Sequence, residues 1–140
     1  MLNTLLADEY VLYTKTLNYH WNVEGQNFSE LHKFFESQYE ELSSIIDSVA
    51  ERARALGGKA LGSLSEFLHH ARIKEAPKSN QKAQAMIKEL LSNHEAISAY
   101  LRKDLETCDK VHHDMGTNDF LTGLMEKHEK MAWMLRAFIS

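Results

Sequence analysis

The chain has 140 residues, of which 44% are hydrophobic and 26% charged, with one proline and six glycines. This length allows one domain, expected over residues 1–140, and the scarcity of proline and glycine favours long helices. The net charge is −4 and neither end carries a run of lysine or arginine, which excludes the strongly basic surface typical of nucleic-acid-binding proteins. No apolar run approaches the roughly 20 residues that span a bilayer, and the acidic start lacks the pattern of a secretory signal. We therefore expect a cytoplasmic location, and we assign no role to the single cysteine, Cys108.

The first predicted helix runs from Asn3 to Val23, and Asn3 or Thr4 can cap it. Its apolar residues recur at the three- and four-residue steps of one helical face: Leu6, Tyr10, Tyr13, Leu17 and Trp21. After the short break VEGQN, the second predicted helix runs from Asn27 to Leu56. A capping box of Asn27 with the glutamate three residues later opens it, and two glycines stop it. A loop this short makes the two helices antiparallel.

The next stretch, 59–78, reads as a crossover with its own short helix, SEFLHHA, which is capped by Ser63 together with Glu66. A third long helix is predicted to begin at Ser79 and to end near HHDMG. Thr117 is the predicted cap of a fourth helix that continues to the end of the chain. Two antiparallel pairs joined by a long crossover are typical of one architecture. The predicted fold is an all-α, ferritin-like four-helix bundle with a short extra helix between the second and third long helices.

The second helix carries a stripe of possible metal ligands. Asp47 and Glu51 are four residues apart, a spacing at which two carboxylates can share one cation. Such pairs are usually solvated surface residues, but a helical wheel places His32, Glu36, Asp47 and Glu51 within about 100° of one another. An apolar stripe lies beside them: Leu31, Phe35, Leu42, Ile46, Val49 and Ala53.

A geometric conflict decides how these ligands can be used. An antiparallel hairpin brings His20 and His32 to the same end of the molecule, whereas Asp47 lies about 22 Å farther along the second helix. No metal ion bridges that distance. The set closes if a second copy packs antiparallel across a two-fold axis, which gives two sites per dimer. A di-iron centre within one chain is not supported, because the only Glu-x-x-His motif is Glu66 to His69 in the crossover.

Three motifs, NYHWNVEGQNFSELHKFFE, IIDSVAERARALGG and HEKMAWMLRAF, resemble the signature of the Dps family, the miniferritins, over nearly the whole chain. This resemblance implies that His20 binds iron directly and that His32 contributes as a ligand or through a water molecule. It also implies that Asp47 and Glu51 come from the two-fold neighbour, so that a two-iron ferroxidase centre is shared between two subunits.

The same resemblance extends to two more residues and to the activity. Glu36 stands where the family often has an aspartate ligand, and Trp21 matches a tryptophan beside the centre that is thought to intercept oxidising equivalents. The family oxidises Fe(II), usually with hydrogen peroxide in preference to dioxygen. It stores ferric mineral in a hollow homododecamer, which protects the cell from oxidative damage. The expected protein is therefore an enzyme, a ferroxidase.

Several alternatives remain open. Asp114 and Asp119 are candidates for an iron pore, but a solvated turn with acids at a helix start explains them equally well. Taken singly, His20 and His32 favour two hydrogen-bonded histidines that close a turn, whereas together with the acids and the family resemblance they favour a metal site. A non-catalytic cage, metal-binding or DNA-associated scaffold of the same fold, holding zinc or only stabilising a dimer, is the alternative function. Direct DNA binding is not expected, because the chain lacks the lysine-rich terminal extensions of DNA-binding family members.

Overall fold

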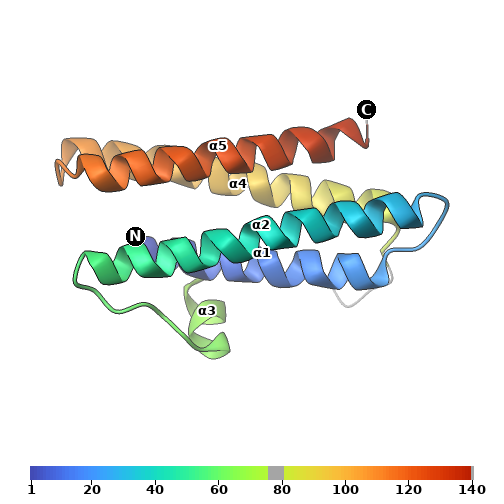
Figure 1. Ribbon diagram of the computed structural model, residues 1–140, viewed down its shortest axis with the longest axis horizontal. Coiled ribbons are helices and arrows are strands. Elements are labelled where there is room, and N and C mark those ends of the chain that lie inside the picture. The colour runs from blue at the N-terminus through green and yellow to red at the C-terminus, as the bar shows by residue number, and fades with distance from the viewer. Residues whose placement is uncertain (76–80, 140) are drawn as a thin grey trace. The chain divides into compact units, whose positions relative to one another are not determined.

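The structure is a computed structural model that describes residues 1–75 and 81–139. In this part of the chain the regular secondary structure is helical throughout (Figure 1). The helices are α1 (Leu2–Asn22), α2 (Phe28–Ala55), α3 (Leu64–His70), α4 (Ala83–Lys110) and α5 (Met115–Ala137). Among the described residues, no helix combines the length and the apolar character needed to cross a membrane. The chain divides into two compact units, Met1–Met86 and Ile87–Ser140.

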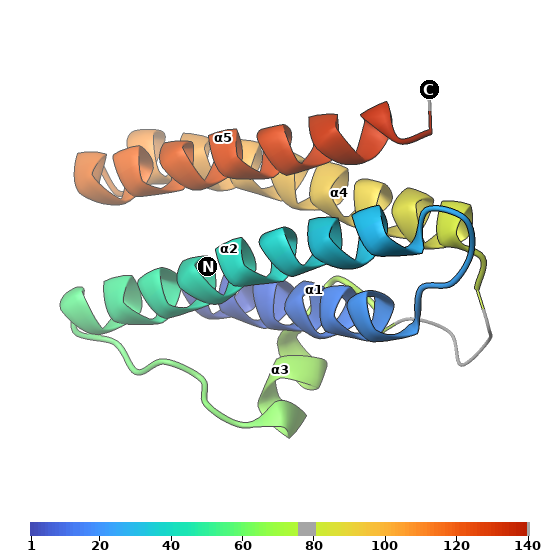
Figure 2. The same cartoon turned by 45° about the vertical axis from the view of Figure 1, so that its right-hand side comes forward.

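In the first unit, α1 and α2 run antiparallel side by side, and α3 packs on α1 (Figures 1 and 2). The turn between α1 and α2 depends on Gly25, whose φ of 115° is strained for residues with a Cβ atom. Burial of apolar side chains along both helices holds the hairpin, at about 1.5–3 kcal/mol for each large one. The fully buried ones include Leu5, Leu12, Phe35, Leu42 and Val49. The predicted antiparallel hairpin is confirmed.

The start of α1 differs from the prediction. Met1 is the N-cap and makes no side-chain cap bond, so the assignment of Asn3 or Thr4 as the cap is wrong. The Asn3 side chain is used elsewhere. Its Nδ2 donates to the Lys59 carbonyl at 2.9 Å, and its Oδ1 accepts from the Leu61 amide at 3.1 Å. Asn3 therefore ties the beginning of the crossover to α1.

The start of α2 is placed correctly but is closed differently. Asn27 is the N-cap, yet its side chain makes no cap bond, so the predicted capping box with Glu30 does not form. The cause is the backbone of Asn27, whose φ of −99° and ψ of 24° depart from the extended geometry that aims a cap side chain at the first-turn amides. The end is as predicted, with Gly57 at a φ of 92° directly after the C-cap Leu56.

The crossover contains the predicted short helix, α3. Ser63 Oγ accepts from the Glu66 amide at 3.3 Å and donates to the Glu66 carboxylate at 2.8 Å, which confirms this capping pair. The carboxylate in turn has a lowered pKa, chiefly because of the bond from Ser63. Pro77 and Ser79, which the prediction used to end the crossover and open the third long helix, lie outside the described residues.

A buried carboxylate anchors the end of the crossover to α1. Asp8 is fully buried, and it accepts hydrogen bonds from the backbone amides of Arg72 and Ile73 and from Arg72 Nε at 2.9 Å. Arg72 Nη2 also lies 2.7 Å from Asp8 Oδ2. Two turns farther along the same face of α1, Lys15 Nζ donates to the Lys74 carbonyl at 2.9 Å. Two charged side chains of α1 thus replace the regular backbone partners that this irregular segment lacks.

In the second unit, α4 and α5 lie antiparallel (Figure 2). The predicted cap Thr117 is wrong: Asp114 is the N-cap, and Thr117 is a donor to it through its amide at 3.0 Å and its Oγ1 at 2.6 Å. A carboxylate suits this position because it interacts favourably with the helix N-terminus. Between the two helices, the Nδ1 atoms of buried His94 and His128 are 2.9 Å apart, a hydrogen bond that was not anticipated from the sequence.

Candidate metal centre at the histidine hairpin

The hairpin of α1 and α2 brings two histidines into direct contact. His20 lies in the last turn of α1 and His32 in the second turn of α2. Their rings stack with centroids 3.9 Å apart and planes inclined by 14°. This contact confirms the prediction that the hairpin brings both imidazoles to the same end of the two helices.

Hydrogen bonds fix how these two rings are protonated. His20 Nδ1 donates to the His32 carbonyl at 2.7 Å, and His32 Nδ1 donates to the His20 carbonyl at the same distance. A carbonyl oxygen can only accept, so each Nδ1 must carry the proton in the neutral ring. The lone pair is then on Nε2, as in metal-binding histidines whose other nitrogen is hydrogen-bonded. The histidines do close the turn by hydrogen bonds, and that bonding leaves Nε2 of each ring with a lone pair that can bind a metal.

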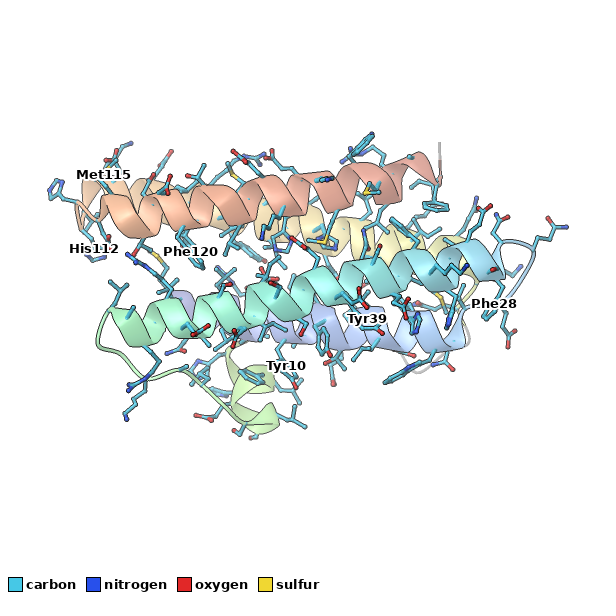
Figure 3. The ribbon with its side chains drawn as sticks, viewed as in Figure 1. Tyr10, Phe28, Tyr39, His112, Met115 and Phe120 are labelled. Atoms are coloured by element: carbon cyan, nitrogen blue, oxygen red, sulfur yellow. The ribbon has the colours of Figure 1, made fainter. Side chains whose placement is uncertain are left out.

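Aromatic residues hold these rings in place. Phe28 stacks on His32 with centroids 5.2 Å apart, and Tyr39 packs edge-on against His20 at 5.1 Å (Figure 3). His20 is only 6% exposed. Neither aromatic residue was singled out from the sequence, although Phe28 and Tyr39 stand four residues before and seven residues after His32, on the same helical face. That spacing was the available signal.

Glu36 follows His32 by one helical turn and is exposed. Partial burial and the negative charge of Glu36 raise the pKa of Tyr39, whose phenol is hydrogen-bonded to the Glu36 carboxylate. Glu36 therefore lies beside the histidine pair, and its carboxylate is held by the Tyr39 phenol. Trp21, next to His20 in the sequence, is 66% exposed.

The two remaining predicted ligands form a separate pair toward the other end of α2. A hydrogen bond with Asp47 and the charge of that residue raise the pKa of Glu51, so the two carboxylates lie side by side. Like charges this close disfavour ionisation of one partner, and a bound cation would relieve that repulsion. The pair therefore has the electrostatic character of half a cation site.

The two half-sites stay apart within one chain. Because α2 is a continuous helix of 28 residues, the 15 residues from His32 to Asp47 correspond to about 22 Å along its axis. Across residues 1–75 and 81–139, no three histidine, cysteine, aspartate or glutamate side chains come together as a metal-binding group. The histidines with Glu36 and the pair of Asp47 with Glu51 are therefore two separate clusters of predicted ligands.

The two pore candidates lie in the second unit. Asp114 caps α5 with its carboxylate, as expected for an acid in a solvated turn at a helix start. Asp119 is exposed on the first turns of α5. His113, beside the cap, has a φ of 51°. Their role in a pore stays a prediction.

Comparisons with known proteins identify the family of this chain. A family model for the ferritin-like domain matches residues 1–140. The DNA protection during starvation protein 2 of Bacillus anthracis is 39% identical, over 100% of this chain and 94% of its own length. The chain belongs to the Dps family of ferritin-like proteins. A low-temperature-induced protein of Nostoc, described as uncharacterized, is 46% identical over 99% of this chain and 78% of its own.

Similarity to a solved Dps structure supports the fold. The Dps protein of Vibrio cholerae O1, described as a member of a broad superfamily of ferritin-like diiron-carboxylate proteins, is 34% identical and superposes with a TM-score of 0.93. The match covers 99% of this chain and 86% of that one. The predicted all-α ferritin-like fold with a short extra helix in the crossover is confirmed. Membership of the Dps family also indicates a general role in iron storage and protection from oxidative damage.

Proposed function

We propose that this Dps protein is a ferroxidase that oxidises Fe(II) at a two-iron centre shared between two subunits. His20, His32 and Glu36 of one subunit would face Asp47 and Glu51 of the other across a two-fold axis. The observation that carries the proposal is the pair of Nδ1 hydrogen bonds, which leaves both Nε2 lone pairs available, together with the 28-residue helix that keeps the carboxylates away from them.

The donor set suits iron that changes oxidation state. Imidazole nitrogens accept Fe(II), whereas carboxylate oxygens favour the harder Fe(III) ion. An interfacial site with few protein ligands also leaves coordination positions open for an oxidant. We propose hydrogen peroxide as the preferred oxidant, with Trp21 beside the centre as a residue that intercepts excess oxidising equivalents.

The proposal also covers the assembly of the protein and its location in the cell. The chain would act as one domain, residues 1–140, in a hollow homododecamer built from two-fold dimers that stores ferric mineral in the cytoplasm. Direct DNA binding is not expected of a chain with a net charge of −4. The relatives named for DNA protection are compatible with indirect protection through removal of iron and peroxide.

Peroxide-driven Fe(II) oxidation, followed by ferric absorbance, tests the proposal. The wild type is compared with Asp47→Ala/Glu51→Ala and with the control Glu106→Ala/Asp109→Ala, which removes two exposed carboxylates from α4. Native size is checked for all three. We expect oxidation well above the protein-free rate for the wild type and the control, and loss of it in the Asp47 and Glu51 variant. If the wild type matches the protein-free rate, the protein is a non-catalytic assembly, and retained zinc would favour a metal-binding role without redox turnover.

A further inference from the structure

A row of tyrosines leads away from the histidine pair. Tyr39 packs edge-on against His20 at 5.1 Å, and Tyr13 packs edge-on against Tyr39 at 6.2 Å between ring centroids. Tyr10 then meets Tyr13 at 5.8 Å and stacks on Phe67 of α3 at 4.5 Å. Three of the five tyrosines in the chain thus form one continuous series of ring contacts that begins at a proposed iron ligand.

The row follows from the geometry of two helices. Tyr10, Tyr13 and His20 recur at steps of three and seven on α1 and so share one face, while Tyr39 reaches across from α2. The three tyrosines are each partly exposed, so they are not simply core residues. Tyr10 lines a cavity of about 350 Å³ together with Lys15, Phe67 and other residues of α1 and the crossover. The far end of the row therefore lies at a cavity, away from the metal centre.

From these contacts we propose that Tyr39, Tyr13 and Tyr10 form a relay that carries a single oxidising equivalent from the iron centre to Tyr10. The inference rests on the proposed ferroxidase function. Phenols suit this task because each can give up one electron and one proton and remain a neutral radical.

The relay is needed when only one Fe(II) is bound. Hydrogen peroxide takes up two electrons and two protons to give two water molecules, and one Fe(II) supplies one of these electrons. Tyr39 supplies the second electron and one proton, which reaches the peroxide oxygen, and solvent supplies the other proton. The products are Fe(III), two water molecules and a neutral Tyr39 radical. Tyr39 then regains an electron and a proton from Tyr13, and Tyr13 regains them from Tyr10.

The test uses the assembled protein, loaded with less than one Fe(II) per histidine pair and mixed with hydrogen peroxide. Freeze-quenched electron paramagnetic resonance measures the tyrosyl radical, and peptide mass spectrometry locates oxidised side chains. Variants Tyr39→Phe and Tyr13→Phe interrupt the relay, whereas Tyr100→Phe on α4 is the matched control. Trp21→Phe separates the tyrosine signal from that of the neighbouring tryptophan.

We expect a tyrosyl radical and oxidation at Tyr10 in the wild type and in Tyr100→Phe, and a larger tyrosyl signal in Trp21→Phe, because the competing tryptophan is removed. Tyr39→Phe should lose most of the radical signal, and Tyr13→Phe should keep the radical at Tyr39 but lose the oxidation at Tyr10. Unchanged oxidation of Tyr10 in Tyr13→Phe overturns the relay, and this variant decides the matter if Tyr39→Phe does not assemble. Iron oxidation without a tyrosyl radical contradicts the relay alone. Absence of iron oxidation in the wild type contradicts both the ferroxidase and the relay, which would then have no source of oxidising equivalents.

Discussion

His20 and His32 each donate from Nδ1 to the backbone carbonyl of the other residue, at 2.7 Å in both directions. These two bonds join the end of α1 to the start of α2, and they also leave Nε2 of each ring as the atom available to a metal. One interaction thus stabilises the hairpin and prepares the proposed site.

The two roles can be separated at His32. In His32→Asn the side-chain amide can replace Nδ1 as donor to the His20 carbonyl but has nothing in place of Nε2, whereas His32→Ala removes both. We expect His32→Ala to lower the free energy of unfolding by about 1–2 kcal/mol, since the His20 carbonyl loses its partner, and His32→Asn to lower it by less. Both should lose most peroxide-driven iron oxidation. Denaturant unfolding and ferric absorbance measure the two effects, and full oxidation activity in His32→Asn would show that this ring is not a ligand.

Repulsion between the Asp47 and Glu51 carboxylates predicts that neutralising one of them slightly stabilises the fold. The raised pKa of Glu51 means that the folded chain holds this proton more tightly than the unfolded chain does. The pair therefore favours folding at low pH and opposes it as the pH rises through the folded-state pKa. In metal-free protein, Asp47→Asn should raise the unfolding temperature slightly at neutral pH, and this gain should vanish below about pH 4, where the carboxyl groups are protonated.

Thermal unfolding at the two pH values measures this difference, with Glu126→Gln on α5 as the exposed control. An Asp47→Asn variant less stable than the wild type at neutral pH without metal would mean that the pair is not repulsive.

The His94–His128 pair predicts sensitivity to acid. Burial, and then the charge of His128, lower the pKa of His94 well below its usual value of 6.5. As the pH falls through 6.5, the unfolded chain takes up a proton that the folded chain resists, so stability falls with the pH. The bond between two Nδ1 atoms also requires one of them to lack a proton.

His94→Asn keeps a side-chain donor near the position of Nδ1 but cannot titrate. The free energy of unfolding of this variant should depend less steeply on pH below 6.5 than that of the wild type. His70→Asn, which changes an exposed histidine of α3, should leave the slope unchanged. Equal slopes for the wild type and His94→Asn would assign the acid sensitivity to other groups.

The Asp8 anchor predicts a large structural effect far from the histidines. Asp8→Ala removes a fully buried acceptor that serves two backbone amides and the Arg72 guanidinium. We expect a loss of about 2–4 kcal/mol in the free energy of unfolding, because buried donors lose a charged partner. Glu126→Ala, at an exposed position, should change stability by no more than about 0.5 kcal/mol. A similar small change for Asp8→Ala would show that the crossover does not depend on this anchor.

Periodicity predicted the helices well because apolar spacing reports directly on the buried face. The apolar stripe of α2 was right at Leu31, Phe35 and Leu42, but Ile45 is buried where Ile46 was expected, and the polar Gln38 is also buried. On an ideal wheel Ile45 and Ile46 lie about 100° apart, on opposite sides of the centre of the apolar stripe, so a small rotation of the helix decides which one is buried. Helix starts were less predictable, since Asn3 and Thr117 each found a partner other than the one a cap would use.

The candidate site was predictable as a set of residues but not as a bonding pattern. The spacing of His20 and His32 across a short break placed them together, and helix length separated them from Asp47. The choice of Nδ1 as donor depends on the backbone carbonyls of the turn, which spacing does not reveal. Tyr39 and its contact with His20 were missed for the same reason, because they depend on how α2 packs on α1.

The central claim, a metal centre shared between two subunits, is tested most directly by mixing two inactive variants. One carries His20→Asn and His32→Asn, and the other carries Asp47→Ala and Glu51→Ala. In a mixed dimer, one interface joins the intact histidines of one subunit to the intact carboxylates of the other. Random pairing should therefore restore about a quarter of the wild-type peroxide-driven iron oxidation. If native mass spectrometry confirms mixed dimers and oxidation stays at the level of the separate variants, the centre is not shared between subunits.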